Sequence, residues 1–155
     1  DLAIRRDDFS PPAGCHAETL FAERIGPVCR PQRLAQWCMH SDEGHATGLR
    51  PEAPLLQSRT RPEAWSTWAE HSGQPPPSGP QLQFDHFYFS LQAAVAGMGL
   101  AIGPWQLVRD DIANGVLAAP MGFVEDGSRY CLLSPAPPTP DGVHDQLLQW
   151  LRAQA

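Results

Sequence analysis

The sequence has no long apolar run, few charged residues and no excess of positive charge. No stretch approaches the roughly 20 apolar residues that a helix needs to cross a bilayer, and no secretory signal is visible. Charged residues make up 18% of the chain and the net charge is -6, so the chain lacks the basic surface that binds a phosphate backbone. These absences argue against a membrane span and against DNA binding by these 155 residues.

The cysteines show no disulfide or metal-binding pattern. The four of them, Cys15, Cys29, Cys38 and Cys131, follow no CxxC spacing and no dense framework. Cys29 and Cys131 lie in apolar runs, as small buried hydrophobic residues do. We therefore expect a reduced, cytoplasmic protein.

Strand-like and helix-like segments alternate along the chain. Strands are expected near residues 2–4, 20–21, 25–29, 53–57, 82–84, 100–102, 116–118 and 129–134. The first of them begins almost at Asp1, so we expect that sequence is missing upstream. The alternation with helices of about three turns predicts an α/β fold with a largely parallel sheet.

Three helices have clear sequence signals. Thr60 and Glu63 have the spacing of a capping box ahead of a helix. A second helix is predicted by the apolar stripe Phe87, Leu91, Ala94, Val95 and Met98, with Gly99 as its left-handed end. The last helix is expected to bury Val143, Leu147, Trp150 and Leu151.

No catalytic or metal-binding constellation is assembled in the sequence. There is no G-x-S-x-G elbow and no phosphate-binding loop. The potential metal ligands Cys38, His40, Asp42, Glu43 and His45 lie in a polar segment without a zinc spacing. We interpret that segment, residues 39–52, as a solvated loop and expect no enzyme activity, metal or cofactor.

A polar and aromatic cluster precedes an apolar helix in FDHFYFSLQAAVAGMGLAIGP, residues 84–104. Asp85 to Tyr88 follow a predicted strand and begin a helix, which is where ligands bind in open α/β sheets. Helix amides there favour an anion or a carboxylate, which His86 and Tyr88 can orient and Phe87 can wall. The alternative is structural, with Asp85 as a helix cap and the aromatic residues in the core.

Residues 84–120, FDHFYFSLQAAVAGMGLAIGPWQLVRDDIANGVLAAP, resemble the effector-binding domain of LysR-type transcriptional regulators. The segments DLAIRR, LFAERIGPVCRP and LLQSRTRPEAWSTWAEHSG fit the same family in order and spacing. The likeness extends over nearly the whole chain and is greatest to the subgroup with regulators of glycine cleavage and β-lactamase induction.

The resemblance implies a two-lobed domain like a type 2 periplasmic binding protein, here incomplete at its N-terminus. Residues 1–26 and 124–155 would belong to the first lobe and residues 27–123 to the second. Pro27, Val28 and Phe123 would lie at the crossovers between the lobes. In the family, such domains form homodimers or tetramers and reach DNA through a separate N-terminal helix-turn-helix, which this sequence lacks.

The resemblance also implies an effector site between the lobes. No membrane partner is expected, because the sequence has no long apolar run. Its second-lobe contacts would be Asp85, His86 and Phe87, beside Tyr88, and a further contact would be Tyr130. The family subgroup commonly has small hydroxyl residues where this chain has His86 and Phe87, which suggests a smaller or more aromatic pocket. The effector would be an amino acid, a carboxylate or a peptidoglycan fragment.

Two other classes of protein remain open from the sequence. One is a solute-binding protein that delivers a ligand to a transporter, which would carry an export signal upstream. The other is an enzyme that uses Cys38, His40 and His45 with a metal. The upstream sequence distinguishes the first from a regulator, and a zinc measurement tests the second.

Overall fold

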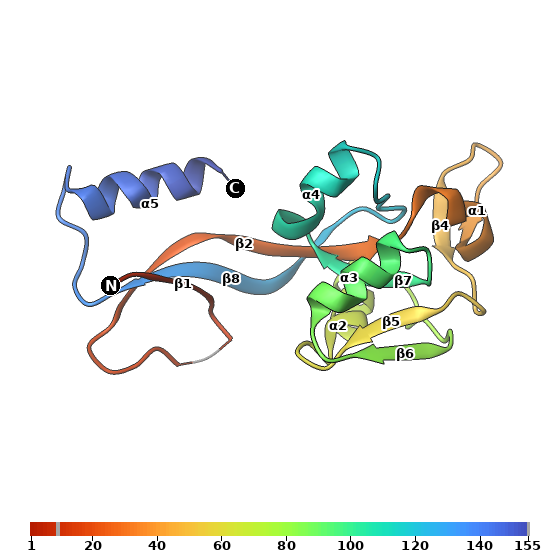
Figure 1. The fold of residues 1–155 in the computed structure, drawn as a ribbon, viewed down its shortest axis with the longest axis horizontal. Helices are drawn as coiled ribbons and strands as arrows, with labels where there is room; N and C mark the ends of the chain where they lie inside the picture. The colour runs from red at the N-terminus through yellow and green to blue at the C-terminus, as the bar shows by residue number, and fades with distance from the viewer. Residues whose placement is uncertain (9, 155) are drawn as a thin grey trace. The chain divides into compact units, whose positions relative to one another are not determined.

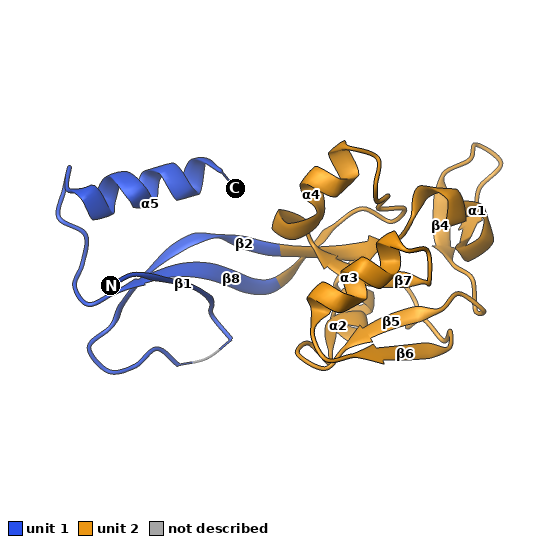
Figure 2. Cartoon of the chain, in the orientation of Figure 1, with its two compact units in different colours: residues 1–23, 127–155 blue, residues 24–126 orange. Residues whose placement is uncertain are grey.

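A computed structural model describes residues 1–8 and 10–154, and the chain divides into two compact units. Unit 1 is residues 1–23 and 127–155, and unit 2 is residues 24–126 (Figure 2). The elements in chain order are β1 (Ala3–Arg6), β2 (His16–Val28), η1 (Pro31–Arg33), α1 (Leu34–Trp37), β3 (Cys38–His40), β4 (Ala46–Leu49), β5 (Leu55–Ser58), α2 (Ala64–Ser72), β6 (Gln81–Phe84), α3 (Phe87–Val95), β7 (Leu100–Pro104), α4 (Trp105–Ala113), β8 (Val124–Ser134) and α5 (Val143–Ala153).

The main sheet is mixed, with the strand order β1-β8-β2-β7-β5-β6. In unit 2, β5 pairs in parallel with both β6 and β7, and Figure 1 shows β5 and β6 running side by side. In unit 1, β1 pairs antiparallel with β8. In unit 2, the end of β2 pairs antiparallel with β7. The predicted α/β class is confirmed, whereas the expectation of a mostly parallel sheet in each lobe is correct only for β6-β5-β7. Those three strands are joined by helices α2 and α3, which supply the crossovers that parallel pairing needs.

Unit 2 has a core on each face of its sheet. On the α2 face, Trp65 and Trp68 pack with Leu55, Leu100 and Ile102. On the other face, α3 and α4 pack on β5 and β7 in a cluster that contains Leu56, Leu91, Ala94, Ala101 and Val108. Strands β5 and β7 are buried along their whole lengths, as interior parallel strands usually are.

Helix α3 ends earlier than its apolar stripe predicts. Its last residue is Val95, and Gly97, with φ 80°, takes the left-handed conformation that the sequence suggested for Gly99. Gly99 has a different constraint, because a Cβ there would lie 2.5 Å from the carbonyl oxygen of Pro54. The glycine therefore allows the chain to approach the start of β5.

Two other sequence predictions about helices are wrong in detail. Helix α2 begins at Ala64, and the Thr60 hydroxyl pairs with the Ser58 hydroxyl at 2.8 Å, so the capping box does not form as predicted. In α5, Leu148 is the buried residue, while Val143 and Trp150 are 79% and 59% exposed. Leu151 does pack against the cluster of Leu20, Leu132 and Leu148, so the predicted inner face of α5 is only partly correct.

The segment that we interpreted as a solvated loop contains a β-hairpin. Strands β3 and β4 pair antiparallel from Cys38 opposite Leu49 to His40 opposite Ala46. Glu43 and His45 lie 3.7 Å apart in its exposed turn, while Cys38 is buried. Among the residues that the structure describes, no group of three or more His, Cys, Asp or Glu side chains could hold a metal ion.

The cysteines are free thiols, and three of the four are buried. Burial, and then the nearby Cys38, raise the pKa of Cys29 to about 12. Burial also raises the pKa of Cys38, against a smaller opposite effect of Arg50. A raised pKa disfavours the thiolate, which is the form that attacks electrophiles and binds metals.

In unit 1, Arg152 ties α5 to β2. Its Nε donates to the Thr19 carbonyl at 2.9 Å and its Nη2 lies 3.1 Å from a Glu18 carboxylate oxygen. The other Glu18 oxygen lies 2.8 Å from His16 Nε2. The hydrogen bond with His16 has the largest effect on the pKa of Glu18 and lowers it. Burial raises this pKa, Arg152 lowers it further, and the net shift is downward.

Thiol labelling tests the burial of the cysteines. At about pH 8 in native buffer, where an ordinary thiol is partly ionised, we expect Cys15 alone to react rapidly with a coloured disulfide reagent. All four cysteines should react in urea. The Cys15→Ser variant should show no rapid reaction, and rapid labelling of Cys38 in that variant would contradict the buried position.

Glu18→Gln tests the interaction that joins α5 to β2. Because the folded-state pKa is lowered, the carboxylate stabilises the fold above its ordinary pKa of 4.5, and this stabilisation is lost as the pH falls through the folded-state pKa. We expect the variant to lose about 0.5 kcal/mol of unfolding free energy at about pH 7, as for a surface ion pair, and to match the parent near about pH 2.

Urea unfolding at the two pH values measures this difference. Glu70→Gln, at an exposed position of α2, is the matched control and should change little. An equal loss in both variants would show that the Glu18 contacts contribute nothing specific.

Candidate functional site

The carboxyl ends of the parallel strands place two turns side by side. Ser58, the last residue of β5, is in register with Phe84, the last residue of β6. The pairing continues one residue further, since the Arg59 amide donates to the Phe84 carbonyl at 2.9 Å. The turn after β5 and the turn at Asp85 therefore begin next to each other, at the edge where ligands bind in α/β sheets.

Asp85 pairs with Arg59 across these two turns. An Arg59 Nη1 to Asp85 Oδ1 distance of 3.1 Å defines the pair, and the two side chains are 68% and 75% exposed. Such exposed pairs contribute little to stability. The helix cap is His86, whose extended backbone precedes α3 and whose side chain makes no capping hydrogen bond. Asp85 is therefore an ion-pair partner and not the N-cap that the structural alternative suggested.

Phe87 is half-buried and lies between the core cluster and the turn after β5. Its ring packs against the core cluster on the α3 face of the sheet. The Arg61 guanidinium lies 5.1 Å from the ring centroid, which is a cation–π distance. Phe87, Arg61 and Ser90 also line a cavity of about 10 Å³, enough for about one water molecule. Phe87 thus belongs partly to the core and partly to the wall of the site.

The first turn of α3 exposes two aromatic rings. Tyr88 and Phe89 are 60% and 51% exposed, and their ring centroids are 5.7 Å apart. The exposed His86 ring lies 6.3 Å from that of Phe89. The Phe89 and Ser90 amides donate to the His86 carbonyl at 3.0 and 3.4 Å, so the helix donors left beside this aromatic surface are the amides of Phe87 and Tyr88.

Tyr130 lies on β8 in unit 1, whereas Asp85 to Tyr88 belong to unit 2. Its ring centroid is 5.3 Å from that of Phe21, and it packs against the cluster of Leu20, Leu132 and Leu148. The ring is half-buried. Asp85, His86, Phe87 and Tyr88 are consecutive on unit 2, so the structure brings these four together, and Tyr130 remains a predicted partner from the other unit.

The residues predicted at the crossovers are firmly packed within unit 2. Pro27 and Val28 pair with Ile102 and Ala101 of β7, and Val28 is fully buried. The Phe123 ring contacts Trp105 edge-on, with centroids 5.1 Å apart. Their role as hinge positions, like the predicted lobe boundaries, stays a prediction.

Sequence reasoning missed Arg59 and Arg61. The segment that contains them was interpreted as a helix cap and as part of the family likeness, with no role at the site, although it follows a predicted strand just as Asp85 does. The position after the strand was therefore the available signal. What the sequence could not show was the register that brings Arg59 to Asp85.

Curated relatives of this chain are transcriptional regulators. It is 44% identical over 148 residues to the HTH-type transcriptional regulator TrpI of Pseudomonas aeruginosa, covering 92% of this chain and 48% of that protein. It is 30% identical over 125 residues to the HTH-type transcriptional regulator DsdC of Escherichia coli, covering 79% of this chain and 40% of that one. The chain thus spans about half the length, or less, of these two relatives.

Solved structures of the same class share the fold. The effector domain of AmpR from Pseudomonas aeruginosa is 25% identical and aligns with a TM-score of 0.70 over 99% of this chain and 71% of that one. The AmpR effector-binding domain from Citrobacter freundii gives the same identity and TM-score over 99% and 73%. These likenesses favour the regulator over the transporter partner and the metalloenzyme. Since the LysR substrate binding domain matches over residues 1–155, the chain belongs to that family of regulator domains, which are effector-binding domains and not enzymes.

Proposed function

We propose that this chain is the sensory part of a transcriptional regulator and that it binds a small anionic effector at the carboxyl edge of the unit 2 sheet. The observation that supports this most directly is the register of β5 and β6, which joins Arg59 and Asp85 at the start of α3. The same edge carries a second cation, Arg61, over the Phe87 ring. Two guanidinium groups beside a helix N-terminus favour a ligand with a negative charge.

The roles of the site residues follow from their positions. Asp85 holds Arg59 and can bind an ammonium group of the ligand, while His86 and Tyr88 orient polar groups from the exposed turn. Phe87 walls the site. Tyr130 would close it from the other unit through its hydroxyl. This chemistry fits an amino acid or a small carboxylate, and also a peptidoglycan fragment that carries one.

Effector binding would act by changing the population of conformations. The predicted lobes, residues 27–123 against residues 1–26 and 124–155, would move about crossovers near Pro27, Val28 and Phe123. A ligand shifts such an equilibrium only by the difference between its affinities for the two states. DNA would be bound by a helix-turn-helix outside this acidic chain, and the regulator would work in the cytoplasm. No described helix is long and apolar enough to cross a membrane.

The exposed aromatic surface of α3 supports assembly into a homodimer or tetramer. Leu82 on β6 and Tyr88 and Phe89 on α3 are 43%, 60% and 51% exposed. β6 and α3 pack against each other, so these side chains can form one apolar area at the edge of the sheet. If a second copy of the chain covered this apolar area, effector binding could change the distance between the two helix-turn-helix domains of the dimer.

Two substitutions test the effector site. A thermal-shift screen of amino acids, small carboxylates and peptidoglycan fragments should find a compound that raises the unfolding temperature of the protein. We expect Asp85→Ala and Tyr130→Phe to weaken its affinity by about tenfold or more, since each removes a polar contact. Their unfolding temperatures without the compound should stay close to that of the parent.

Asp110→Ala, at an exposed carboxylate on α4, is the matched control and should bind normally. If both site variants lost stability equally and kept their affinity for the compound, the pocket assignment would be wrong.

Phe89→Glu tests the assembly surface. A charge in the centre of an apolar contact should weaken association, so sedimentation at increasing concentration should show a shift toward the monomer. Leu107→Glu, at a position on α4 that is 49% exposed, is the control and should associate as the parent does. Unchanged association of Phe89→Glu would exclude this surface of α3.

A further inference from the structure

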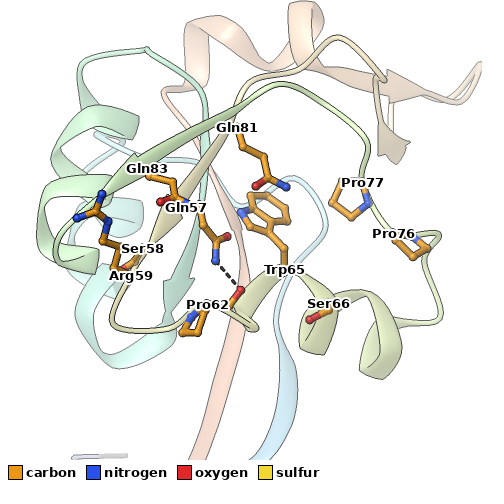
Figure 3. Close-up of a pocket in the computed structure, with 10 residues that line it drawn as sticks. All are labelled: Gln57, Ser58, Arg59, Pro62, Trp65, Ser66, Pro76, Pro77, Gln81 and Gln83. Carbon is orange, nitrogen blue, oxygen red and sulfur yellow. Dashed lines mark hydrogen bonds between the residues drawn. The ribbon is translucent and has the colours of Figure 1, made fainter.

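A second pocket of unit 2 lies on the opposite face of the sheet from α3. Its volume is about 440 Å³, within the usual size range of small-molecule sites. Figure 3 shows its walls, with Gln57, Gln81 and Gln83 from two strands, Trp65 from α2, and Pro76 and Pro77 from the segment before β6. All of these residues belong to unit 2, so the pocket does not depend on the arrangement of the two units.

The strand register explains why this pocket is polar. Gln57 lies opposite Gln83 and Leu55 lies opposite Gln81, so these four side chains share one face of the sheet. Helix α2 covers that face over β5 and β7, where the buried cluster contains Leu55 and Leu100. Strand β6 contributes no residue to this cluster, and its two glutamines are exposed. The uncovered edge of the sheet therefore has an amide floor where a covered strand would have apolar residues.

Gln57 is fixed in one orientation. The side chain is 7% exposed, and its Nε2 donates to the Pro62 carbonyl at 2.6 Å and to the Arg61 carbonyl at 3.3 Å. Both contacts use the NH₂ group, so the carboxamide oxygen is left as an acceptor. Because two carbonyl groups hold the NH₂ group, the carboxamide oxygen is already oriented and can accept a ligand N–H without rearrangement.

Trp65 supplies the complementary donor. The side chain is 6% exposed, and its Nε1 has no hydrogen-bond partner among residues 1–8 and 10–154. A buried N–H without an acceptor carries a desolvation penalty, which a ligand carbonyl would remove. In Figure 3, the indole stands between Gln57 and Pro77, with Gln81 at its far end. The exposed Gln81 side chain can swing aside to admit that carbonyl.

The proline wall is rigid before any ligand arrives. The segment ends at Pro80, whose carbonyl accepts from the Leu55 amide at 2.8 Å. Gly79 is pressed against the Ala53 carbonyl so closely that a Cβ would overlap its oxygen. Prolines also restrict their own backbone. A planar ligand would fit between the rings of Pro76 and Pro77 on one side and the Trp65 indole on the other.

The lining offers little for a charged ligand. Arg59 is the one residue with a charged side chain among those that line the pocket, and it is 68% exposed and paired with Asp85. An acceptor and a donor at fixed positions, with adaptable amides beside them, match the N–H and C=O of an amide. We infer that this pocket binds an uncharged, planar compound with an amide or lactam group, on the face of the sheet opposite α3, and that it shares only the exposed Arg59 and its neighbour Ser58 with the proposed effector site.

The experiment compares nicotinamide and uracil with their acidic counterparts nicotinate and orotate. The five tryptophans give five indole N–H signals in a ¹H–¹⁵N spectrum, and Trp65→Phe identifies the one from Trp65. We expect a neutral amide to shift the Trp65 signal and to leave that of the exposed Trp150 unchanged. Nicotinate, orotate and glucose should not shift it at the same concentrations.

Gln83→Ala and Gln81→Ala keep the buried residues intact and should weaken nicotinamide or uracil binding by about fivefold or more. Gln92→Ala, at an exposed position on α3, should leave it unchanged. The inference is overturned if neither amide shifts the Trp65 signal at up to about 20 mM, where even a weak site would fill. It is also overturned if the acids or glucose bind equally well, or if the glutamine variants bind as the parent does. These results leave the effector proposal untouched, because that proposal is measured on Asp85 and Tyr130.

Discussion

The parallel pairing of β5 with β6 and β7 is the constraint on which both proposed sites depend. Hydrogen bonds hold the start of β5 on both sides, because Leu55 donates to Pro80 and Pro54 accepts from Leu100, each at 2.8 Å. With the starts aligned, the ends must align as well, which brings Arg59 to Asp85. A shift of one residue in this pairing would turn Gln81 and Gln83 to the α3 face and separate the two turns.

The two faces of this sheet are covered unequally, and the polar residues follow that difference. On the α3 face, Phe84 of β6 packs into the core cluster. On the α2 face, the cluster includes residues of β5 and β7 but none of β6. The four residues of the edge strand β6 therefore contribute an apolar side chain to the core on one face and glutamine side chains to the proposed pocket on the other.

The sequence predicts the elements better than their boundaries or contacts. The stripe from Phe87 to Met98 correctly indicates a helix, because periodicity is a local property. It misplaces the end, since Gly97 and Gly99 are equally suited to a cap and the contact of Gly99 with Pro54 decides between them. The β3–β4 hairpin was missed because its strands have only three and four residues, too few to show an alternation of apolar and polar residues.

The same limit applies to the candidate site. Asp85 to Tyr88 could be placed at a strand end from local pattern, and the family resemblance strengthened that assignment. Arg59 could not be assigned to the site, because it lies 26 residues from Asp85 in sequence and only the strand register joins them. Gln57 is a similar case, since its fixed carboxamide depends on the carbonyl groups of Arg61 and Pro62.

The exposure of the Arg59–Asp85 pair has a consequence for how an effector could act. Separating two charges that are mostly in water costs about 1 kcal/mol or less, whereas breaking a buried pair costs several times more. A ligand carboxylate could therefore take Arg59 from Asp85 at little cost, and Asp85 would then be free for a ligand ammonium group. The strands below do not have this freedom, because Gly103 of β7 lies against Val28 and Val108 without room for a Cβ. An exchangeable ion pair above a rigid sheet allows the ligand to reorganise the turns while the core of unit 2 stays unchanged.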